Sequence, residues 1–368
     1  MTTIEHLQSS SQGAFEGRFA TRYAQRWDAT LLPALEGEHR HAALYNRYAP
    51  LEDFHRVVGR PDSLERVRFP SATGDIQADN LMCFTRKQDY ELSGATIPAA
   101  EKASNGLLTH STVDAAASIL ATHILQVVPG DNVLDLCAGQ GRNSITLAQS
   151  IWPSLYPDST MPPMMGAKKG ALHSNNLDSE HNLAQYMPAS VIGTAQLKFS
   201  RLDGTKGAKD LPLGPGGYDK VLVDAPSSDE RRVVQAQAKV VLGQRAKELA
   251  TWDYFSSEHM AEVQVKLLVT ALKAARVGGR VVYSTRSLSE EENDGVVEEA
   301  LSLIEKESKK GDLLWTAEVE HLDGEVERRL VADWAEETAK GWAVLPDHAG
   351  GGKWGPLYFA VLTKKSST

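Results

Sequence analysis

Short apolar strands alternate with helices from about residue 107 onward, and this alternation constrains the fold more than any other feature of the sequence. Apolar runs of strand length read NVLDLC, QLKFSRL, YDKVLVDAP, GGRVVYST and LYFAVLT. The clearest of the intervening helices is HMAEVQVKLLVTALKAARV, which ends at Gly-Gly. Strands that alternate with helices form a mostly parallel sheet with helices on both faces. The sequence therefore predicts an α/β fold over residues 106–368.

Residues 1–105 have a different pattern, and we expect them to form an N-terminal helical extension. Large apolar side chains recur every four positions and form one stripe along an amphipathic helix: Phe15, Phe19, Tyr23, Trp27, Leu31 and Leu35. Such a stripe must pack against the next domain or against a partner. Residues 61–105 are expected to be loop with one short strand at LMCFT, and THSTVDAAASILATHILQVV after them to be a helix. A Pro- and Met-rich insertion near residues 152–172 is expected to be a surface loop.

Composition limits the class of protein. Of the 368 residues, 42% are hydrophobic, so the chain can bury a sizeable core. The net charge of −9 argues against binding nucleic acid by overall charge, although a local basic face stays open. The two cysteines, Cys83 and Cys137, form no metal-ligand spacing, which favours a reducing compartment and no metal site. No apolar run approaches the length of about 18 residues that spans a membrane, and the start of the chain resembles neither a signal peptide nor a good transit peptide.

The strongest local motif is VLDLCAGQGRNS, at residues 133–144. Asp135 ends a predicted strand, and Ala138, Gly139 and Gly141 then let the backbone turn tightly and approach a ligand. A strand, a small-residue loop and the start of a helix together form a nucleotide-type site at the carboxyl edge of a sheet. The D-x-x-x-G-x-G form resembles the S-adenosylmethionine (SAM) loop of class I methyltransferases, with a purely structural turn as the alternative.

Two more aspartates follow predicted strands. Asp203 lies in FSRLDGT, and Asp224 lies in VLVDAPSSDE, where the Ala-Pro that follows stiffens the turn. Each aspartate alone fits a solvated strand end as well as it fits a ligand. Three acidic strand ends in this order point to one shared site.

Four motifs in order carry a more specific resemblance: DLCAGQG, VDAPSS, the helix that contains Gln264, and YSTRSLSEEEN. They resemble the NSUN-type RNA cytosine-5 methyltransferases from about Leu107 to the end of the chain. The segments FEGRFATRYAQRW, LMCFT and WGPLYFAVL resemble the mitochondrial ribosomal RNA branch. The resemblance implies a Rossmann-like class I SAM-dependent methyltransferase sheet. It also implies a role in assembly of the large mitochondrial ribosomal subunit, beside a partner of the mitochondrial transcription-termination-factor type.

Two positions depart from the family pattern. The family turn after the fifth strand reads T-C-S, and its cysteine attacks the cytosine ring; this chain has Thr285-Arg286-Ser287. A second family cysteine lies in P-C-S, where this chain has Pro226-Ser227-Ser228. Arginine is not a nucleophile, and serine without an activating base is a poor one. Since Cys83 and Cys137 lie elsewhere in the sequence, we expect no 5-methylcytosine formation.

The resemblance also implies the cofactor site, which is altered. Its residues would be Cys137, Ala138, Gly139, Gly141, Asn143, Asn176, Asp203, Gly204 and Asp224. The family loop ends P-G-G-K, whereas Asn143 stands here in place of the lysine. Asn176 corresponds to the acidic residue that binds the ribose, with Asp178 as the alternative alignment. SAM binding is therefore expected to be possible but weakened.

RNA contact would have to come from local cations. The basic segment ERRVVQAQAKVVLGQRAK and the turn after the fifth strand supply the expected RNA-binding residues Arg231, Arg232, Lys239, Arg245 and Arg286. For Arg286, an ion pair with Glu290, Glu291 or Glu292 is the alternative.

These observations favour a non-catalytic hypothesis. The chain is expected to be a catalytically impaired homologue that binds ribosomal RNA and large-subunit precursors as an assembly factor, together with a helical-repeat partner of the termination-factor type. The alternative is an active SAM-dependent rRNA methyltransferase with altered chemistry. The resemblance implies a mitochondrial location, with the cytoplasm as the alternative and no association with a membrane.

Overall fold

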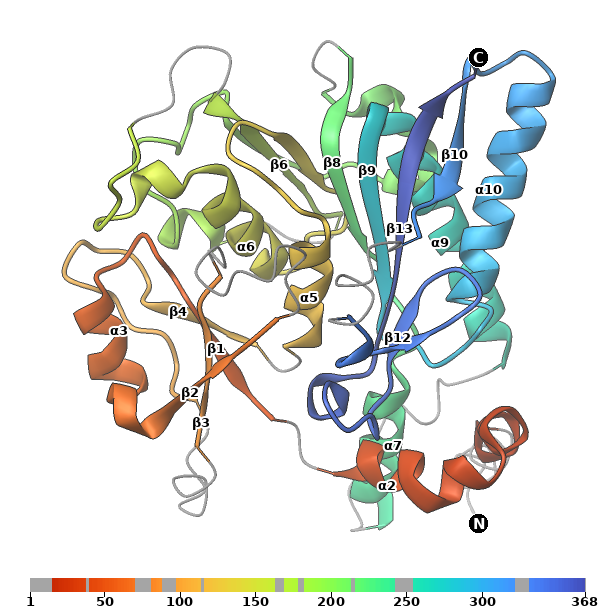
Figure 1. The fold of residues 1–368 in the computed structure, drawn as a ribbon, viewed down its shortest axis with the longest axis horizontal. Helices are drawn as coiled ribbons and strands as arrows, with labels where there is room; N and C mark the ends of the chain where they lie inside the picture. The colour runs from red at the N-terminus through yellow and green to blue at the C-terminus, as the bar shows by residue number, and fades with distance from the viewer. Residues whose placement is uncertain are drawn as a thin grey trace.

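The computed structural model describes residues 15–37, 40–69, 81–87, 97–113, 116–162, 169–177, 182–212, 216–241, 254–321 and 331–367. The side chains of 236–241 and 254–256 lie outside this description, as does part of the Pro- and Met-rich insertion. Within the described ranges, two sheets form the framework of the molecule (Figure 1).

The larger, nine-stranded sheet has the order β11-β12-β13-β9-β8-β5-β6-β7, and β10 pairs with β13. Its parallel strands are β5 (Asn132–Asp135), β6 (Ala171–Asn175), β7 (Leu197–Ser200), β8 (Tyr218–Asp224) and β9 (Ala275–Thr285). The antiparallel part consists of β10 (Trp315–Val319), β11 (Glu336–Glu337), β12 (Trp342–Val344) and β13 (Leu357–Ser366). Strand order reverses between β5 and β8, which is where open α/β sheets bind ligands.

Helices cover both faces of this sheet, as predicted. On one face, α5 (Ala117–Ile124) and α6 (Arg142–Ile151) pack with Leu222, Val282 and Phe359. On the other face, α9 (Tyr254–Ala274) and α10 (Asp294–Lys309) pack with Leu134, Val281 and Tyr358. Short 3-10 turns complete the connections: Pro61–Ser63, Pro153–Leu155, Asn182–Gln185, η6 (Gly204–Lys206), Ala208–Asp210 and Gly352–Trp354.

The N-terminal region contains helices, as expected, and also a second sheet of which the sequence predicted only one strand. This second sheet has the order β2-β3-β1-β4, is antiparallel throughout and consists of β1 (Ala42–Tyr45), β2 (Leu64–Val67), β3 (Cys83–Arg86) and β4 (His110–Val113). Helix α3 (Leu51–Val58) packs on it through Phe54 and Val58. The strand expected at LMCFT is β3. Because β4 completes this sheet, the N-terminal unit extends past residue 105, and HSTV is a strand rather than the start of a helix.

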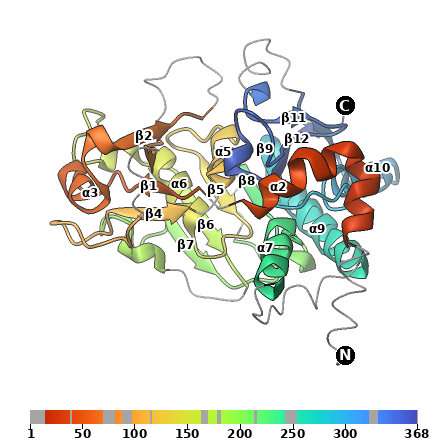
Figure 2. The same cartoon turned by 90° about the horizontal axis from the view of Figure 1, so that it is seen from below.

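Residues 15–37, called the N-terminal strap below, pack against the larger domain (Figure 2). They contain a helix at 15–23, a π-helical turn (Trp27–Leu31) and α2 (Leu32–Glu36). The apolar stripe predicted from the sequence is buried at Phe15, Phe19, Trp27, Leu31 and Leu35, and Tyr23 is half-buried. It packs on Val233 and Val234 of α7 (Glu230–Val241), on Leu288 and on Leu345. The sequence predicted that this stripe packs either on the next domain or on a partner protein. In the structure it packs on the next domain of the same chain.

Candidate functional site

The loop after β5 shapes the candidate ligand site at the reversal of strand order. The Ala138 amide donates to the Asn175 carbonyl at 2.9 Å, and the Gly141 amide donates to the Ala138 carbonyl at 2.7 Å. Gly139 and Gly141 have φ angles of 52° and 84°, so the turn needs glycine at both places. A Cβ on Gly139 would meet nothing within 4 Å, which leaves open space above the loop. The backbone therefore fits the predicted role of a ligand loop at the start of α6.

Asn175, which the sequence did not single out, holds this loop from below. Its side chain donates to the carbonyls of Leu136 at 3.0 Å and Leu202 at 2.9 Å. Its oxygen accepts from Ser200 Oγ at 2.6 Å, and Ser200 in turn contacts Nε2 of the buried His173 at 2.6 Å. His173 Nδ1 contacts the Tyr218 hydroxyl at 2.7 Å. Burial lowers the pKa of His173 to about 4, so the ring is neutral and links a continuous polar network.

The neighbouring strand ends supply the remaining predicted cofactor residues. Asn176 donates from Nδ2 to the Gly139 carbonyl at 3.0 Å, which brings it to the loop as expected. Asp203 accepts from the Thr205 hydroxyl at 2.7 Å and from the Thr205 amide at 3.0 Å, and these bonds lower the pKa of its carboxyl. A Cβ on Gly204 would lie 2.8 Å from the Leu267 side chain, so a larger residue there would have to displace that side chain. The alternative residue Asp178 lies outside the described residues.

Asp224, at the end of β8, is held by two neutral donors. Asn143 Nδ2 donates to one carboxylate oxygen at 2.8 Å, and Ser284 Oγ donates to the other at 3.0 Å. Asn143 itself is buried at the start of α6. The position expected to correspond to the family lysine is thus occupied by an amide that is already bonded to the carboxylate of Asp224.

Asp135 and Cys137 lie on the buried side of the loop. Asp135 accepts from Ser144 Oγ at 2.7 Å, while its Oδ1 has no hydrogen-bond partner among the described residues. Burial raises the pKa of Asp135 to about 7, with the charge of Asp224 adding to the effect. Burial also raises the pKa of the Cys137 thiol, which makes it a poor nucleophile at neutral pH. Cys83 is buried in the N-terminal sheet.

Ser227 and Arg286, the two residues expected to correspond to the family cysteines, lie side by side. The Arg286 backbone amide donates to Ser227 Oγ at 3.1 Å. The Arg286 guanidinium lies 3.9 Å from the Asp229 carboxylate, and 41% of its side chain is exposed. The alternative ion pair with the acidic run at 290–292 is therefore not the one observed.

The acidic run is engaged elsewhere. Glu290 pairs with Arg22, Glu291 pairs with Arg18, and Glu292 is fully buried. Arg26 of the strap adds a bidentate contact to Glu336 and a second to Asp347. The strap is thus attached by charges to the turn that follows β9 and to the C-terminal part of the chain.

The basic segment after β8 is only partly available for RNA. Arg231 is 3% exposed and donates to the Ala34 carbonyl at the end of α2 at 2.9 Å, so the expectation that it contacts RNA is corrected. Arg232 is exposed. The side chain of Lys239 and all of Arg245 lie outside the described residues. Sequence reasoning missed this outcome because the helical face that packs on the strap depends on residues almost 200 positions away.

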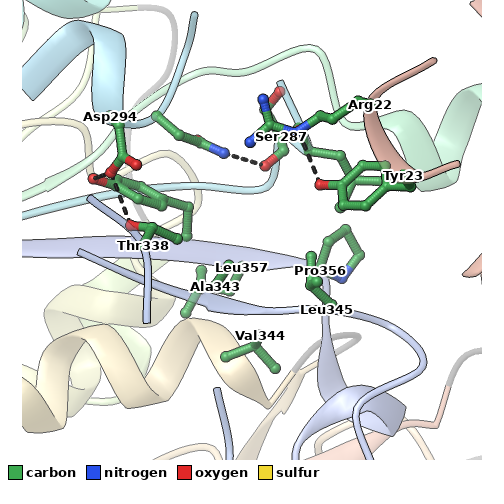
Figure 3. Close-up of a pocket in the computed structure, with 13 residues that line it drawn as sticks. Arg22, Tyr23, Ser287, Asp294, Thr338, Ala343, Val344, Leu345, Pro356 and Leu357 are labelled. Carbon is green, nitrogen blue, oxygen red and sulfur yellow. Dashed lines mark hydrogen bonds between the residues drawn. The ribbon is translucent and has the colours of Figure 1, made fainter. Parts of the chain in front are cut away.

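A small cavity opens beside the turn after β9 (Figure 3). Its volume of about 20 Å³ suits about one water molecule. Tyr23 of the strap reaches the Leu288 carbonyl at 3.3 Å on one side, and Asp294 binds Thr338 and Tyr358 on the other. This cavity belongs to the strap contact and is too small for the candidate ligand.

Two further observations concern other kinds of site. Among the described residues, no three His, Cys, Asp or Glu side chains gather in a way that could hold a metal ion. The described helices include none that is both long enough and apolar enough to cross a membrane.

Comparisons with known proteins agree with this geometry. A family model described as 16S rRNA methyltransferase RsmB/F matches residues 165–331. A mitochondrial tRNA (cytosine(34)-C(5))-methyltransferase of Danio rerio is 28% identical over 95% of this chain and 86% of its own length. The 5-cytosine rRNA methyltransferase NSUN4 of Bos taurus is 27% identical over 80% of this chain and 74% of its own length. The structure of NSun6 from Pyrococcus horikoshii with SFG superposes with a TM-score of 0.57 at 15% identity, covering 96% of this chain and 97% of that one, which shows the fold.

Proposed function

The chain belongs to the NSUN-type family of RNA cytosine-5 methyltransferases, and from this premise we propose that it binds ribosomal RNA as an assembly factor and does not methylate cytosine C5. The proposed client is the precursor of the large ribosomal subunit in mitochondria. The mitochondrial part draws support from the first relative, whose name places it in that organelle.

The observation that carries the proposal is the pairing of Ser227 with Arg286. A nucleophile is needed at this place to attack the cytosine ring, and the two side chains offer a hydroxyl and a guanidinium. Glu230, the nearby carboxyl that could act as a base, contacts Ser228 and Ser287, and the structure gives it no contact with Ser227. Arg286 is half-exposed on the turn after β9, where its planar fork can bind a phosphate.

The candidate SAM site supports weakened binding of that cofactor. The glycine loop is open, and Asp203 and Asp224 are present at the strand ends. Its polar anchors at 143 and 176 are amides, however, and the amide nitrogen of each is already bonded to the protein. When bound, SAM would supply an electrophilic methyl group, and these residues would hold its sugar and its amino acid part.

The alternative is an active SAM-dependent rRNA methyltransferase that uses different chemistry. The retained loop and the retained aspartates favour it. It predicts transfer of labelled methyl groups from SAM to rRNA at an atom other than cytosine C5.

Methyl transfer separates the two functions. Purified protein is incubated with labelled SAM and large-subunit precursor RNA, and modified nucleosides are identified after digestion. We expect no labelled 5-methylcytosine from the wild type or from Arg286→Cys, because Ser227 and the amide-lined cofactor site would remain. Labelled 5-methylcytosine from the wild type contradicts the proposal, and a different labelled nucleoside favours the alternative.

Co-sedimentation with large-subunit precursors tests the positive part of the proposal. Arg286→Ala should weaken association, because a phosphate contact is lost. Arg276→Ala is the matched control. Arg276 lies near the start of β9, at the opposite end of that strand from Arg286, and pairs with Asp219 of β8. If the wild type sediments free of all ribosomal particles, the assembly role is wrong.

A protein partner is part of the proposal. The net charge of −9 gives no overall attraction to RNA, so a helical-repeat protein of the termination-factor type would add affinity and specificity. Native purification should recover such a protein together with large-subunit components. Recovery of the chain alone at physiological salt would remove the partner from the proposal.

A further inference from the structure

Two carboxyl groups lie buried against each other behind the turns that carry Ser227 and Arg286. Glu230, at the start of α7, and Glu292, just before α10, are both 0% exposed. Ser287 Oγ lies 3.0 Å from Glu230 Oε1 and 3.1 Å from Glu292 Oε1, so one hydroxyl bridges the two acids. A buried carboxylate normally has a cation partner, because an unpaired charge is costly away from water.

The partners of this pair are all neutral in the described part of the chain. Glu230 also contacts Ser228 Oγ and accepts from the Leu288 amide at 2.8 Å. Glu292 accepts from the Ser228 amide at 3.0 Å and from Gln264 Nε2 at 2.9 Å. None of these donors is a lysine or an arginine, so two ionised carboxylates here would repel each other without compensation.

The hydrogen bonds of Ser287 point to the same conclusion. Its hydroxyl lies within hydrogen-bond distance of Glu230 Oε1 and Glu292 Oε1 but has only one hydrogen to donate, and Ser228 gives its own hydrogen to Glu230. One additional proton on a carboxyl oxygen lets Ser287 both donate to one acid and accept from the other.

We propose that Glu230 and Glu292 share one proton and act together as positioning residues for Ser227 and Arg286. Ser228 follows Ser227 and Ser287 follows Arg286, and both serines contact the pair. The acids therefore join the turn after β8 to the turn after β9 and fix the spacing of Ser227 and Arg286. This inference does not depend on RNA binding.

The charged surroundings fit a proton held within the pair. Burial and the neighbouring Glu292 raise the pKa of Glu230 to about 7. Two phenols interact with the pair: Tyr23 of the strap lies near Glu230, and Tyr283 Oη on β9 donates to the backbone carbonyl of Glu292. The charged groups on the neighbouring elements are Arg18, Arg22, Asp229, Arg231, Arg286, Glu290 and Glu291. Arg18 and Arg22 are paired with Glu291 and Glu290, and Arg231 is bonded to the strap backbone.

The sign of the pH dependence follows from the raised pKa. The folded state holds the shared proton more tightly than the unfolded chain does, so the pair stabilises the fold at low pH and loses this contribution as pH rises through about 7. In Glu230→Gln, the side-chain amide supplies a hydrogen-bond donor at every pH, in place of the carboxyl proton that the wild type loses as pH rises. Since Asp135 and His173 also titrate in this range, the useful quantity is the difference in Tm between variant and wild type at each pH.

The first test measures Tm from pH 5 to pH 8.5 for the full-length wild type, Glu230→Gln and the exposed control Glu298→Gln. We expect Glu230→Gln to match the wild type at pH 5 and to exceed it by on the order of 5 °C at pH 8.5. Glu298→Gln should show no pH-dependent difference. A constant offset for Glu230→Gln at every pH indicates a purely structural residue and overturns the shared proton.

The second test covers the case in which a variant fails to fold. The infrared spectrum of the folded wild type at pH 6 should contain band intensity for two protonated, buried carboxyl groups, one from Asp135 and one from the pair, and the intensity of a single group overturns the proposal. Hydrogen exchange measures the positioning. Glu230→Ala should lose amide protection at both 226–232 and 285–292, and Glu230→Gln should restore it. Loss confined to one of the two turns would show that the pair does not join them.

Discussion

At the scale of single residues, we expect the bond between Asn143 and Asp224 to weaken SAM binding. The amide occupies a carboxylate oxygen without adding positive charge. We expect the wild type to bind SAM more weakly than the low micromolar range, and Asn143→Lys to tighten binding because an ion pair replaces a neutral bond. Calorimetry with SAM measures both, with Asn132→Lys at the exposed start of β5 as the control. Low micromolar affinity in the wild type would show that Asn143 does not weaken SAM binding, and it would favour the enzymatic alternative.

His173 gives a second prediction at this scale. Because its pKa is lowered to about 4 in the folded state, the neutral ring stabilises the fold above about pH 6.5, and this contribution is lost as pH falls toward 4. His173→Gln should reduce the loss of stability between these pH values, because glutamine does not titrate. Urea unfolding of both proteins at pH 7.5, 5.5 and 4.5 measures this. Parallel curves for the two proteins would exclude His173 as the titrating group.

Some residues of the candidate site could be predicted from the sequence. Others could not, because their burial depends on contacts with residues far away in the chain. Asp203, Asp224 and the glycines follow apolar strand runs, so their place at one sheet edge could be read from the sequence. Glu292 lies in the run Glu290–Glu292, which has the composition of an exposed helix start. Its burial depends on Ser228 and Gln264, which are distant in the sequence and leave no local pattern.

At the scale of elements, the N-terminal strap is attached mainly by its aromatic side chains. Trp27 is 1% exposed and stacks near Phe19 with ring centroids 5.3 Å apart. Trp27→Ala should cost about 3–5 kcal/mol of unfolding free energy, since a large cavity would open. Tyr23→Ala should cost clearly less, because that ring is only half-buried. Guanidinium unfolding measures both, and equal losses would mean that the stripe does not carry the attachment.

Strands were predictable where the sequence shows an apolar run between helical segments. The runs that became β5, β8, β9 and β13 consist mostly of buried residues and can be recognised in the sequence alone. Of the N-terminal sheet only β3 was expected, because β2 and β4 mix polar with apolar side chains and β1 is an isolated run of four residues. Such strands are stabilised by pairing with distant partners, which propensity does not record.

At the scale of the whole molecule, net charge sets how RNA binding should respond to salt. With a charge of −9, the protein should contact RNA through a few local cations such as Arg232 and Arg286. Each phosphate neutralised on a single strand contributes about −0.7 to the slope of log affinity against log salt. We expect a shallow slope in the wild type, smaller by about 0.7 in Arg286→Ala. A filter-binding series in KCl measures it, and an unchanged slope in the variant would remove Arg286 from the RNA contact.

The ion pairs of Arg26 with Glu336 and Asp347 have a consequence for the order of folding. The strap is translated long before the surfaces on which it docks, which include α7, Leu288 and Leu345. While the ribosome is still producing the middle of the chain, the aromatic stripe has no covering within its own polypeptide and exposes a chaperone-binding surface. Docking of the first described segment is therefore a late step of biosynthesis, possible only when nearly the entire chain has emerged.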